Sequence, residues 1–163
     1  MSSAVLSIGS NLGDRIGTLR GAVDAFAPWL RAVSPVYETP PWGPVPQDDY
    51  LNAVLLVADR DATPLDWLRR AHAAERTAGR TRDVRWGPRT LDVDVVAVDD
   101  ITSDDPELTL PHPRAHERAF VLVPWLAVDP DAVLSGEPVA DRLAALPAAD
   151  VVAVRKVAGE ALT

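Results

Sequence analysis

Apolar positions in the first two thirds of the chain recur with two periods, one typical of strands and one typical of helices. Apolar runs of strand length, bounded by polar, glycine or proline positions, occur at residues 4–8, 33–38, 50–57 and 91–98. Residues with helical spacing follow Asp14, and a second helix is expected to begin after Thr63, with Pro64 at its first position. The pattern therefore predicts the order strand, helix, strand, strand, helix, strand.

This order predicts an α+β fold of the ferredoxin-like βαββαβ type, a sandwich in which two helices pack on an antiparallel sheet. Beyond Pro111 the pattern is less regular, so we expect an irregular C-terminal extension with a short helical or extended piece at residues 120–127. We see no internal repeat and no linker. A chain of 163 residues is then expected to form one domain over residues 1–163.

Composition excludes several kinds of chemistry. The chain has no cysteine, which rules out disulfides, thiolate nucleophiles and cysteine-ligated metals. Its one lysine, Lys156, lies near the C-terminus, so the glycine-rich phosphate loop that ends in a lysine cannot be present. The net charge of −8 argues against a nucleic-acid partner. The longest apolar stretch, residues 51–58, is too short to span a membrane.

Two further expectations concern where the protein works and in what form. The first four residues lack the basic start of a secretory signal, so a cytoplasmic location is expected. No hydrophobic stripe that would join two copies is visible, and we therefore expect a monomer.

Basic residues are concentrated in one segment of this acidic protein. Between residues 69 and 89 the chain has seven arginines against Glu75 and Asp83, a net charge of +5. The arginines are at positions 69, 70, 76, 80, 82, 85 and 89. A solvated helix face with a loop is one interpretation, and a socket for a small polyanion such as nucleotide phosphates is the other. Composition alone does not choose between them.

Two aspartates lie on the last predicted strand of the core. Because side chains alternate along a strand, Asp92 and Asp94 share a face, with Cα atoms roughly 6.5–7 Å apart. Carboxylate oxygens suit Mg²⁺, and two such ions can bridge a triphosphate. Two solvent-facing aspartates on a half-exposed strand would give the same pattern.

Other polar pairs suggest a place for a flat ligand and for phosphate. Tyr50 and Asn52 share a strand face and offer a ring and an amide to a heterocycle, although a cross-strand packing pair would look the same. His112 and His116 have the spacing of helical metal ligands, but the proline between them argues against a regular helix. Phosphate contact by His112 and Arg118 is therefore the better interpretation.

Taken together, these segments resemble one family, the 6-hydroxymethyl-7,8-dihydropterin pyrophosphokinases. The matching stretches occur in the family's order at residues 8–12, 37–41, 50–52, 85–94 and 111–114, the last together with Arg118 and Phe120. The string WGPRTLDVD, at residues 86–94, is the most specific of them. Beyond Asp131 nothing aligns, and the tail is assigned no function.

The resemblance implies transfer of pyrophosphate from ATP to the hydroxymethyl group of the pterin, with release of AMP, in folate biosynthesis. It implies two Mg²⁺ ions held by Asp92 and Asp94, which form the catalytic set together with Arg80 and Arg89. Residues implied to bind ATP are Glu75, Arg80, Arg82, Trp86, Arg89, His112 and Arg118. Residues implied to bind the pterin are Thr39, Pro40, Trp42, Tyr50, Asn52 and Phe120.

Two other classes fit part of the pattern. One is a different two-metal phosphohydrolase that uses Asp92, Asp94, His112 and His116, and it would hydrolyse nucleotide without any pterin. The other is a nucleotide-binding ferredoxin-like module that binds without turnover. Neither explains Tyr50 and Asn52, the proline-rich segment at residues 39–46 and the WGPRTLDVD string together.

Overall fold

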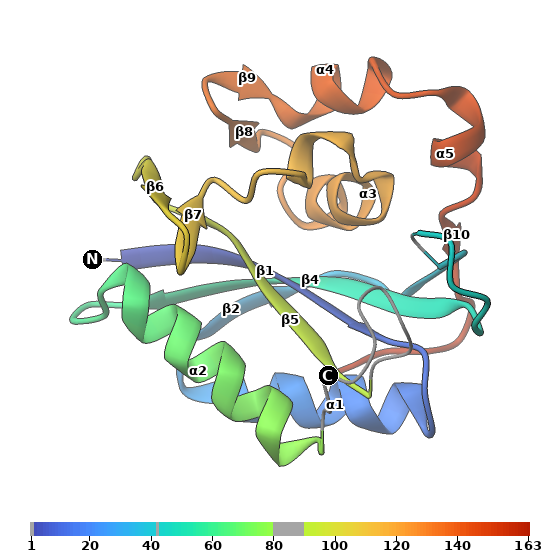
Figure 1. Cartoon of the computed structure of the whole chain (residues 1–163), viewed down its shortest axis with the longest axis horizontal. Helices are drawn as coiled ribbons and strands as arrows, with labels where there is room; N and C mark the ends of the chain where they lie inside the picture. The colour runs from blue at the N-terminus through green and yellow to red at the C-terminus, as the bar shows by residue number, and fades with distance from the viewer. Residues whose placement is uncertain (1, 42, 80–89) are drawn as a thin grey trace.

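The structure is a computed structural model that describes residues 2–41, 43–79 and 90–163, and an antiparallel sheet lies at its centre. Five strands form the path β10-β3-β4-β1-β5, and β2 also pairs with β4 (Figure 1). The strands are β1 (Ser2–Ser10), β2 (Leu30–Val33), β3 (Tyr37–Thr39), β4 (Tyr50–Asp59), β5 (Asp92–Val98) and β10 (Arg155–Lys156). Strand β1 lies between β4 and β5, so its register decides which of their residues become neighbours.

Helices cover both faces of the sheet, as Figure 1 shows. One face carries α1 (Arg15–Phe26), which continues into a 3₁₀ turn (Ala27–Trp29), and α2 (Pro64–Thr77). The other face carries α3 (Ala119–Val128), against which α4 (Val139–Ala144) and α5 (Ala148–Val152) pack. The remaining elements are the hairpin of β6 (Ser103–Asp105) and β7 (Leu108–Leu110), a 3₁₀ turn (Ala115–Glu117), and the hairpin of β8 (Val133–Leu134) and β9 (Glu137–Pro138).

The predicted α+β order is confirmed, with one local difference in the second strand. In place of one strand at residues 33–38 there are two short strands, β2, which ends at Val33, and β3, which begins at Tyr37. Pro35 has no backbone N–H for a sheet ladder. Beside it, the Ser34 hydroxyl oxygen accepts a hydrogen bond from the backbone N–H of Val54 at 2.8 Å, in place of a backbone carbonyl. The proline therefore divides the strand without separating it from β4.

Helix α2 begins where the sequence predicts. The Thr63 hydroxyl oxygen accepts from the backbone N–H of Asp66 at 3.2 Å, and the Asp66 carboxylate accepts from the backbone N–H of Thr63 at 2.8 Å. This reciprocal pair satisfies two N–H groups that a helix start leaves without partners. The helix start is thereby fixed beside the far end of β4.

Two apolar cores hold the layers together. The larger lies between the sheet and α1 with α2, and its largest fully buried side chains include Phe26, Trp67 and Leu6. The smaller lies between the opposite face and α3 with α4, and it includes Val54, Val96 and Trp125. Burial of this kind contributes about 25 cal/mol per Å² of apolar surface removed from water. The sheet is therefore a rigid platform with one layer on each side.

The C-terminal extension is more regular than the sequence pattern indicates. Residues 119–128 form a helix that is apolar on nearly all sides, so it shows no amphipathic period, and Pro124 lies inside it. The tail then returns to the sheet, where β10 pairs with β3. In the described part of the chain, no helix is long and apolar enough to cross a bilayer.

We expect Arg70 to stabilise the end of the sheet that lies far from β3. Its guanidinium carbon lies 3.8 Å from the ring centroid of Trp29 and 4.8 Å from that of Trp67, and its Nη2 is 2.7 Å from Asp59 Oδ2. The Arg70→Lys substitution should lower the free energy of unfolding by about 1–2 kcal/mol, because an ammonium group cannot stack between two rings. Urea unfolding measures this, and the exposed neighbour variant Arg69→Lys is the control. Equal losses in both variants would contradict the stacking role.

Candidate active site

Cross-strand pairing on β1 brings the polar residues together. Gly9 pairs with Asn52 on β4 and with Asp92 on β5. Directly opposed residues in antiparallel strands place their side chains on the same face. In the next row, Val54 and Asp94 share that face, and Val54 belongs to the core beneath α3. The amide and the two carboxylates therefore lie on the α3 face, with β4 and β5 roughly 10 Å apart across β1.

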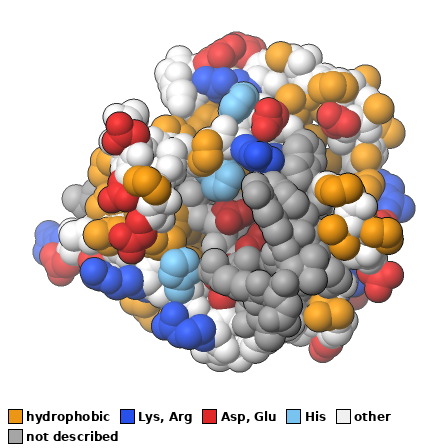
Figure 2. Space-filling model, viewed as in Figure 1, with side chains coloured by type: hydrophobic (Ala, Val, Ile, Leu, Met, Phe, Trp, Pro, Cys, Tyr) orange, Lys and Arg blue, Asp and Glu red, His pale blue; other side chains and the backbone are white. Residues whose placement is uncertain are grey.

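The carboxylate pair is half-buried and faces a buried arginine. Arg118 precedes α3 and is 8% exposed, and its Nη1 lies 3.8 Å from Asp94 Oδ2. That distance is too long for a hydrogen bond, so the interaction is an ion pair. Burial lowers the pKa of Arg118, but a guanidinium stays protonated in proteins. Figure 2, a view from the side of the layers, shows acidic, histidine and basic side chains close together near the centre of the picture.

His112 reaches the same region from the loop after β7. Its backbone N–H donates to the Val96 carbonyl at 2.8 Å, and its ring Nδ1 accepts from the backbone N–H of Arg114 at 3.1 Å. An accepting Nδ1 leaves the proton of a neutral ring on Nε2. Burial, and next the charge of Arg118, lower the pKa of His112 to about 4, although Asp92 opposes the shift. His112 is therefore a neutral hydrogen-bond donor at neutral pH.

The titration of His112 is a direct check on this environment. In ligand-free protein its ring should titrate near pH 4, well below the usual value of 6.5. Because the unfolded chain binds this proton first, the contribution of His112 to stability should fall as pH drops from about 6.5 to about 4. Proton NMR resolves the ring signals, since the chain has three histidines. A midpoint near 6.5 would show that His112 is solvated.

Thr39, Tyr50 and Asn52 form a second cluster beside the carboxylates. Asn52 Nδ2 donates to Thr39 Oγ1 at 2.6 Å, and both residues are 3% exposed. Tyr50 pairs with Thr39 across β3 and β4 and is half-buried. Phe120 lies at the start of α3, with its ring centroid 5.5 Å from the Arg118 guanidinium carbon. The structure thus places an amide and a phenol ring at the start of β4, a hydroxyl beside them on β3, and a second ring on α3.

Glu75 is buried between α2 and β5, a location that its position in the sequence does not reveal. It is 4% exposed, and its carboxylate accepts from the backbone N–H of Val93 at 3.0 Å. Val93 stands between Asp92 and Asp94, so this contact ties α2 to the strand that carries both. Contact of Glu75 with ATP stays a prediction, while support of β5 is a role that sequence reasoning missed.

Asn11 and Arg15 were also missed, and both hold the segment that follows β3. Asn11 Nδ2 donates to Gln47 Oε1 at 2.7 Å and to the Asp48 carbonyl at 2.8 Å. Arg15 Nη1 is 2.9 Å from Glu38 Oε2 and donates to the Asp49 carbonyl at 3.0 Å. The family-like stretch at residues 8–12 was the available signal for Asn11, but its role depends on a contact 36 residues away in sequence.

The remaining expected residues are Pro40 and five that lie outside the described segments. Pro40 is exposed directly after Thr39. Five residues predicted to bind the pterin or ATP lie outside the described residues, namely Trp42, Arg80, Arg82, Trp86 and Arg89. Their roles stay predictions.

The carboxylates fit a magnesium–phosphate complex better than a metal held by protein alone. Within residues 2–41, 43–79 and 90–163, no group of three or more histidine or acidic side chains could hold a metal ion. Magnesium typically takes one or two carboxylates and completes its octahedral shell with phosphate oxygens and water. Asp92 and Asp94 supply such a pair, on the same face of β5.

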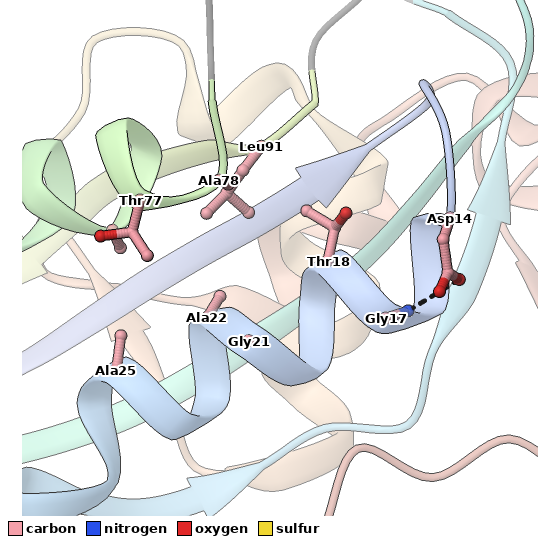
Figure 3. A pocket seen from close by; sticks show the side chains of 10 residues that line it. Asp14, Gly17, Thr18, Gly21, Ala22, Ala25, Thr77, Ala78 and Leu91 are labelled. Atoms are coloured by element: carbon pink, nitrogen blue, oxygen red, sulfur yellow. Dashed lines mark hydrogen bonds between the residues drawn. The ribbon is translucent and has the colours of Figure 1, made fainter.

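A separate hollow of about 360 Å³ lies on the opposite side of the sheet, between α1 and α2. Its lining is mostly small residues, with Asp14 at one end, Ala25 and Thr77 toward the other end, and Leu91 across from α1, as Figure 3 shows. None of the described residues that line it is an expected site residue. The Asn52, Asp92 and Asp94 side chains lie instead on the α3 face.

These features are typical of a class of α+β enzymes that act on phosphate groups, with an amide and aromatic rings nearby that suit a flat polar molecule. Residues 5–130 match the family model for 7,8-dihydro-6-hydroxymethylpterin-pyrophosphokinase (HPPK). In an alignment of 168 positions, the chain is 50% identical to a 2-amino-4-hydroxy-6-hydroxymethyldihydropteridine pyrophosphokinase of Mycobacterium tuberculosis, covering 95% of this chain and 89% of that protein. A protein of the same name from Methylorubrum extorquens is 45% identical over 90% of this chain and 94% of its own length.

Solved structures agree on the fold. Wild-type Plasmodium falciparum HPPK-DHPS with STZ-DHP superposes with a TM-score of 0.68 at 14% identity, covering 88% of this chain and 43% of that one. This chain thus spans less than half of that structure. The chain belongs to the 7,8-dihydro-6-hydroxymethylpterin-pyrophosphokinase family. The predicted family, α+β fold and pyrophosphokinase class are confirmed.

Proposed function

We propose that the two clusters on the α3 face bind the two substrates of the family's reaction. The Thr39–Asn52 side takes 6-hydroxymethyl-7,8-dihydropterin, and the Asp92–Asp94 side takes magnesium-ATP. The main support for this proposal is the register of the strands, in which Asn52 and Asp92 pair with the same residue of β1, Gly9. Because Asn52 and Asp92 lie in the same row, the two proposed subsites are neighbours. This arrangement supports transfer between the hydroxymethyl oxygen of the pterin and a phosphorus of ATP.

The pterin subsite offers both polar and aromatic contacts. The Asn52 amide has a donor and an acceptor, and its hydrogen bond to Thr39 fixes its orientation at the start of β4. Tyr50 supplies a ring from the sheet and Phe120 supplies one from the α3 layer that covers it, which suits a flat heterocycle. Pro40 and Trp42 are proposed to complete this subsite.

The phosphate subsite combines fixed cations and donors with the carboxylate pair. Asp92 and Asp94 would hold the magnesium ions, which would neutralise charge on the phosphate oxygens when bound. Arg118 carries a positive charge whose burial strengthens its pull on an anion. His112 offers an Nε2–H to a phosphate oxygen. Glu75 is proposed to support β5 and to border the ATP site.

These groups suit a direct transfer. The hydroxymethyl oxygen attacks the β-phosphorus, the bond between that phosphorus and the oxygen of the α-phosphate breaks, and AMP leaves while the hydroxyl proton is released. The fixed charge of Arg118 and the His112 donor stabilise the oxygens on which negative charge grows. No side-chain nucleophile is required, in agreement with a chain that has no cysteine.

Four residues outside the described segments and two metal ions are also part of the proposal. Arg80, Arg82, Trp86 and Arg89 are proposed to contact ATP, with Arg80 and Arg89 in the catalytic set. Two magnesium ions are proposed to bind with ATP. The single domain over residues 1–163, the monomeric state, the cytoplasmic location and the absence of a nucleic-acid partner also stay predictions.

Substrate affinities of the Asn52→Ala variant test the division into two subsites. The substitution should weaken pterin binding by about 1–3 kcal/mol, because ring hydrogen bonds are left unmade, and should leave ATP affinity unchanged. Isothermal titration calorimetry with each substrate measures both. The control is Ser34→Ala, which also removes a hydrogen bond next to β4 but lies outside both clusters. Equal weakening of both substrates would show that Asn52 supports the fold instead.

A further inference from the structure

Gly9 is a glycine whose backbone does not require one. It lies inside β1, is buried, and is not among the glycines with positive φ. A glycine within a strand is less favourable than alanine, since it loses more backbone freedom and packs no side chain. The reason for glycine at this position must therefore lie in what surrounds it.

The surroundings leave no room for a side chain. A Cβ atom on Gly9 would lie 2.9 Å from Asn52 Oδ1 and 3.3 Å from Tyr50 Cδ1. Asn52 cannot simply turn away, because its Nδ2 is bound to Thr39 at 2.6 Å. The third close atom is the Leu51 carbonyl oxygen at 3.6 Å, so the three nearest atoms all belong to β4. A methyl group here would therefore push on the amide and ring of the pterin side.

We infer that Gly9 is a specificity-determining residue for the pterin, because its bare backbone lets the Asn52 amide lean over β1 in the orientation that recognises the ring. This inference rests on the proposed pterin subsite. Gly9 acts through Asn52 and is a positioning residue, not a catalytic one. A side chain at this position selects against the pterin while leaving the carboxylate side of the site intact.

Ligand affinities of four proteins test this inference: wild type, Gly9→Ala, Asn52→Ala and the double variant. The probes are 6-hydroxymethyl-7,8-dihydropterin, with and without a non-hydrolysable ATP analogue, and the magnesium complex of that analogue alone. Gly9→Ala should weaken pterin binding by about tenfold or more and change the affinity for the analogue by less than about twofold. Gly21→Ala is the matched control, since a Cβ at Gly21 meets nothing within 4 Å.

The double variant decides whether Gly9 works through Asn52. Once the Asn52 amide is gone, Gly9→Ala should change pterin affinity by less than about twofold further, a non-additivity expected of residues in contact. Additive losses would overturn the inference, as would Gly9→Ala that binds pterin normally while Asn52→Ala does not. If Asn52→Ala itself binds pterin normally, the proposed subsite is wrong, and that outcome is distinct from the other two.

Folding of the variants provides a second readout. If Gly9→Ala lowers the midpoint of thermal unfolding strongly, the double variant should recover the midpoint of Asn52→Ala, because the obstructing amide is absent. A double variant as unstable as Gly9→Ala would show that the methyl group disturbs the strand itself, and would overturn the inference.

Discussion

Replacing Asp92 or Asp94 with Asn should lower the rate of pyrophosphate transfer by about 10²–10⁴-fold. An amide keeps the shape of the side chain but removes the charge with which β5 would hold magnesium. The fold should survive, because both side chains are half-buried on a polar face and two neighbouring carboxylates repel each other, although the Asp94 variant also loses its ion pair with Arg118. Steady-state kinetics over a range of magnesium concentrations measures the loss.

The control for this prediction is Asp100→Asn, an exposed aspartate just beyond β5. It should retain the wild-type rate and magnesium dependence. Near-normal turnover in both site variants would contradict the assignment of the metal ions to this strand.

The Arg118→Gln substitution is expected to have the second-largest effect. Arg118 is buried beside Asp94, so its charge acts where water screens it least. Loss of one such group from a preorganised site costs about 10²–10³-fold in rate, and the pterin affinity should change far less. A comparison of kcat with pterin affinity for the variant separates the two effects.

Arg142→Gln is the matched control for Arg118→Gln. Arg142 lies in the same layer, and its side chain is also largely buried, but it donates to the Leu134 carbonyl at 2.8 Å and takes no part in the site. Its variant should lose stability and keep its rate. A similar fall in rate for both variants would mean that Arg118 holds the layer together and does not stabilise charge on phosphate.

The order of strands and helices was predictable because each element carries its own hydrophobic period. Alternation along one strand also predicted that Asp92 and Asp94 share a face. The division of the second strand was not predicted, although Pro35 was visible. The contact that keeps the divided strand beside β4 comes from the Ser34 hydroxyl, which a hydrophobic pattern does not reveal. Helix α3 was predicted only in part, since a helix that is apolar on nearly all sides shows no amphipathic period in its sequence.

Features that depend on long-range neighbours lay beyond sequence reasoning. The pairing of Gly9 with both Asn52 and Asp92 depends on strand register, which the pattern of one strand does not encode. Glu75 appeared as a helix residue, and its bond to Val93 appears only when α2 lies against β5. The low pKa of His112 follows from burial and from Arg118, neither of which the local sequence reveals.

Formation of AMP shows directly whether the chain transfers pyrophosphate to the pterin. The purified chain is incubated with magnesium and ATP, with and without 6-hydroxymethyl-7,8-dihydropterin. AMP should form only when the pterin is present, in an amount equal to that of the pyrophosphorylated pterin. Hydrolysis of ATP without pterin would indicate a phosphohydrolase, and binding without turnover would indicate a binding module. Either result would contradict the proposed transfer.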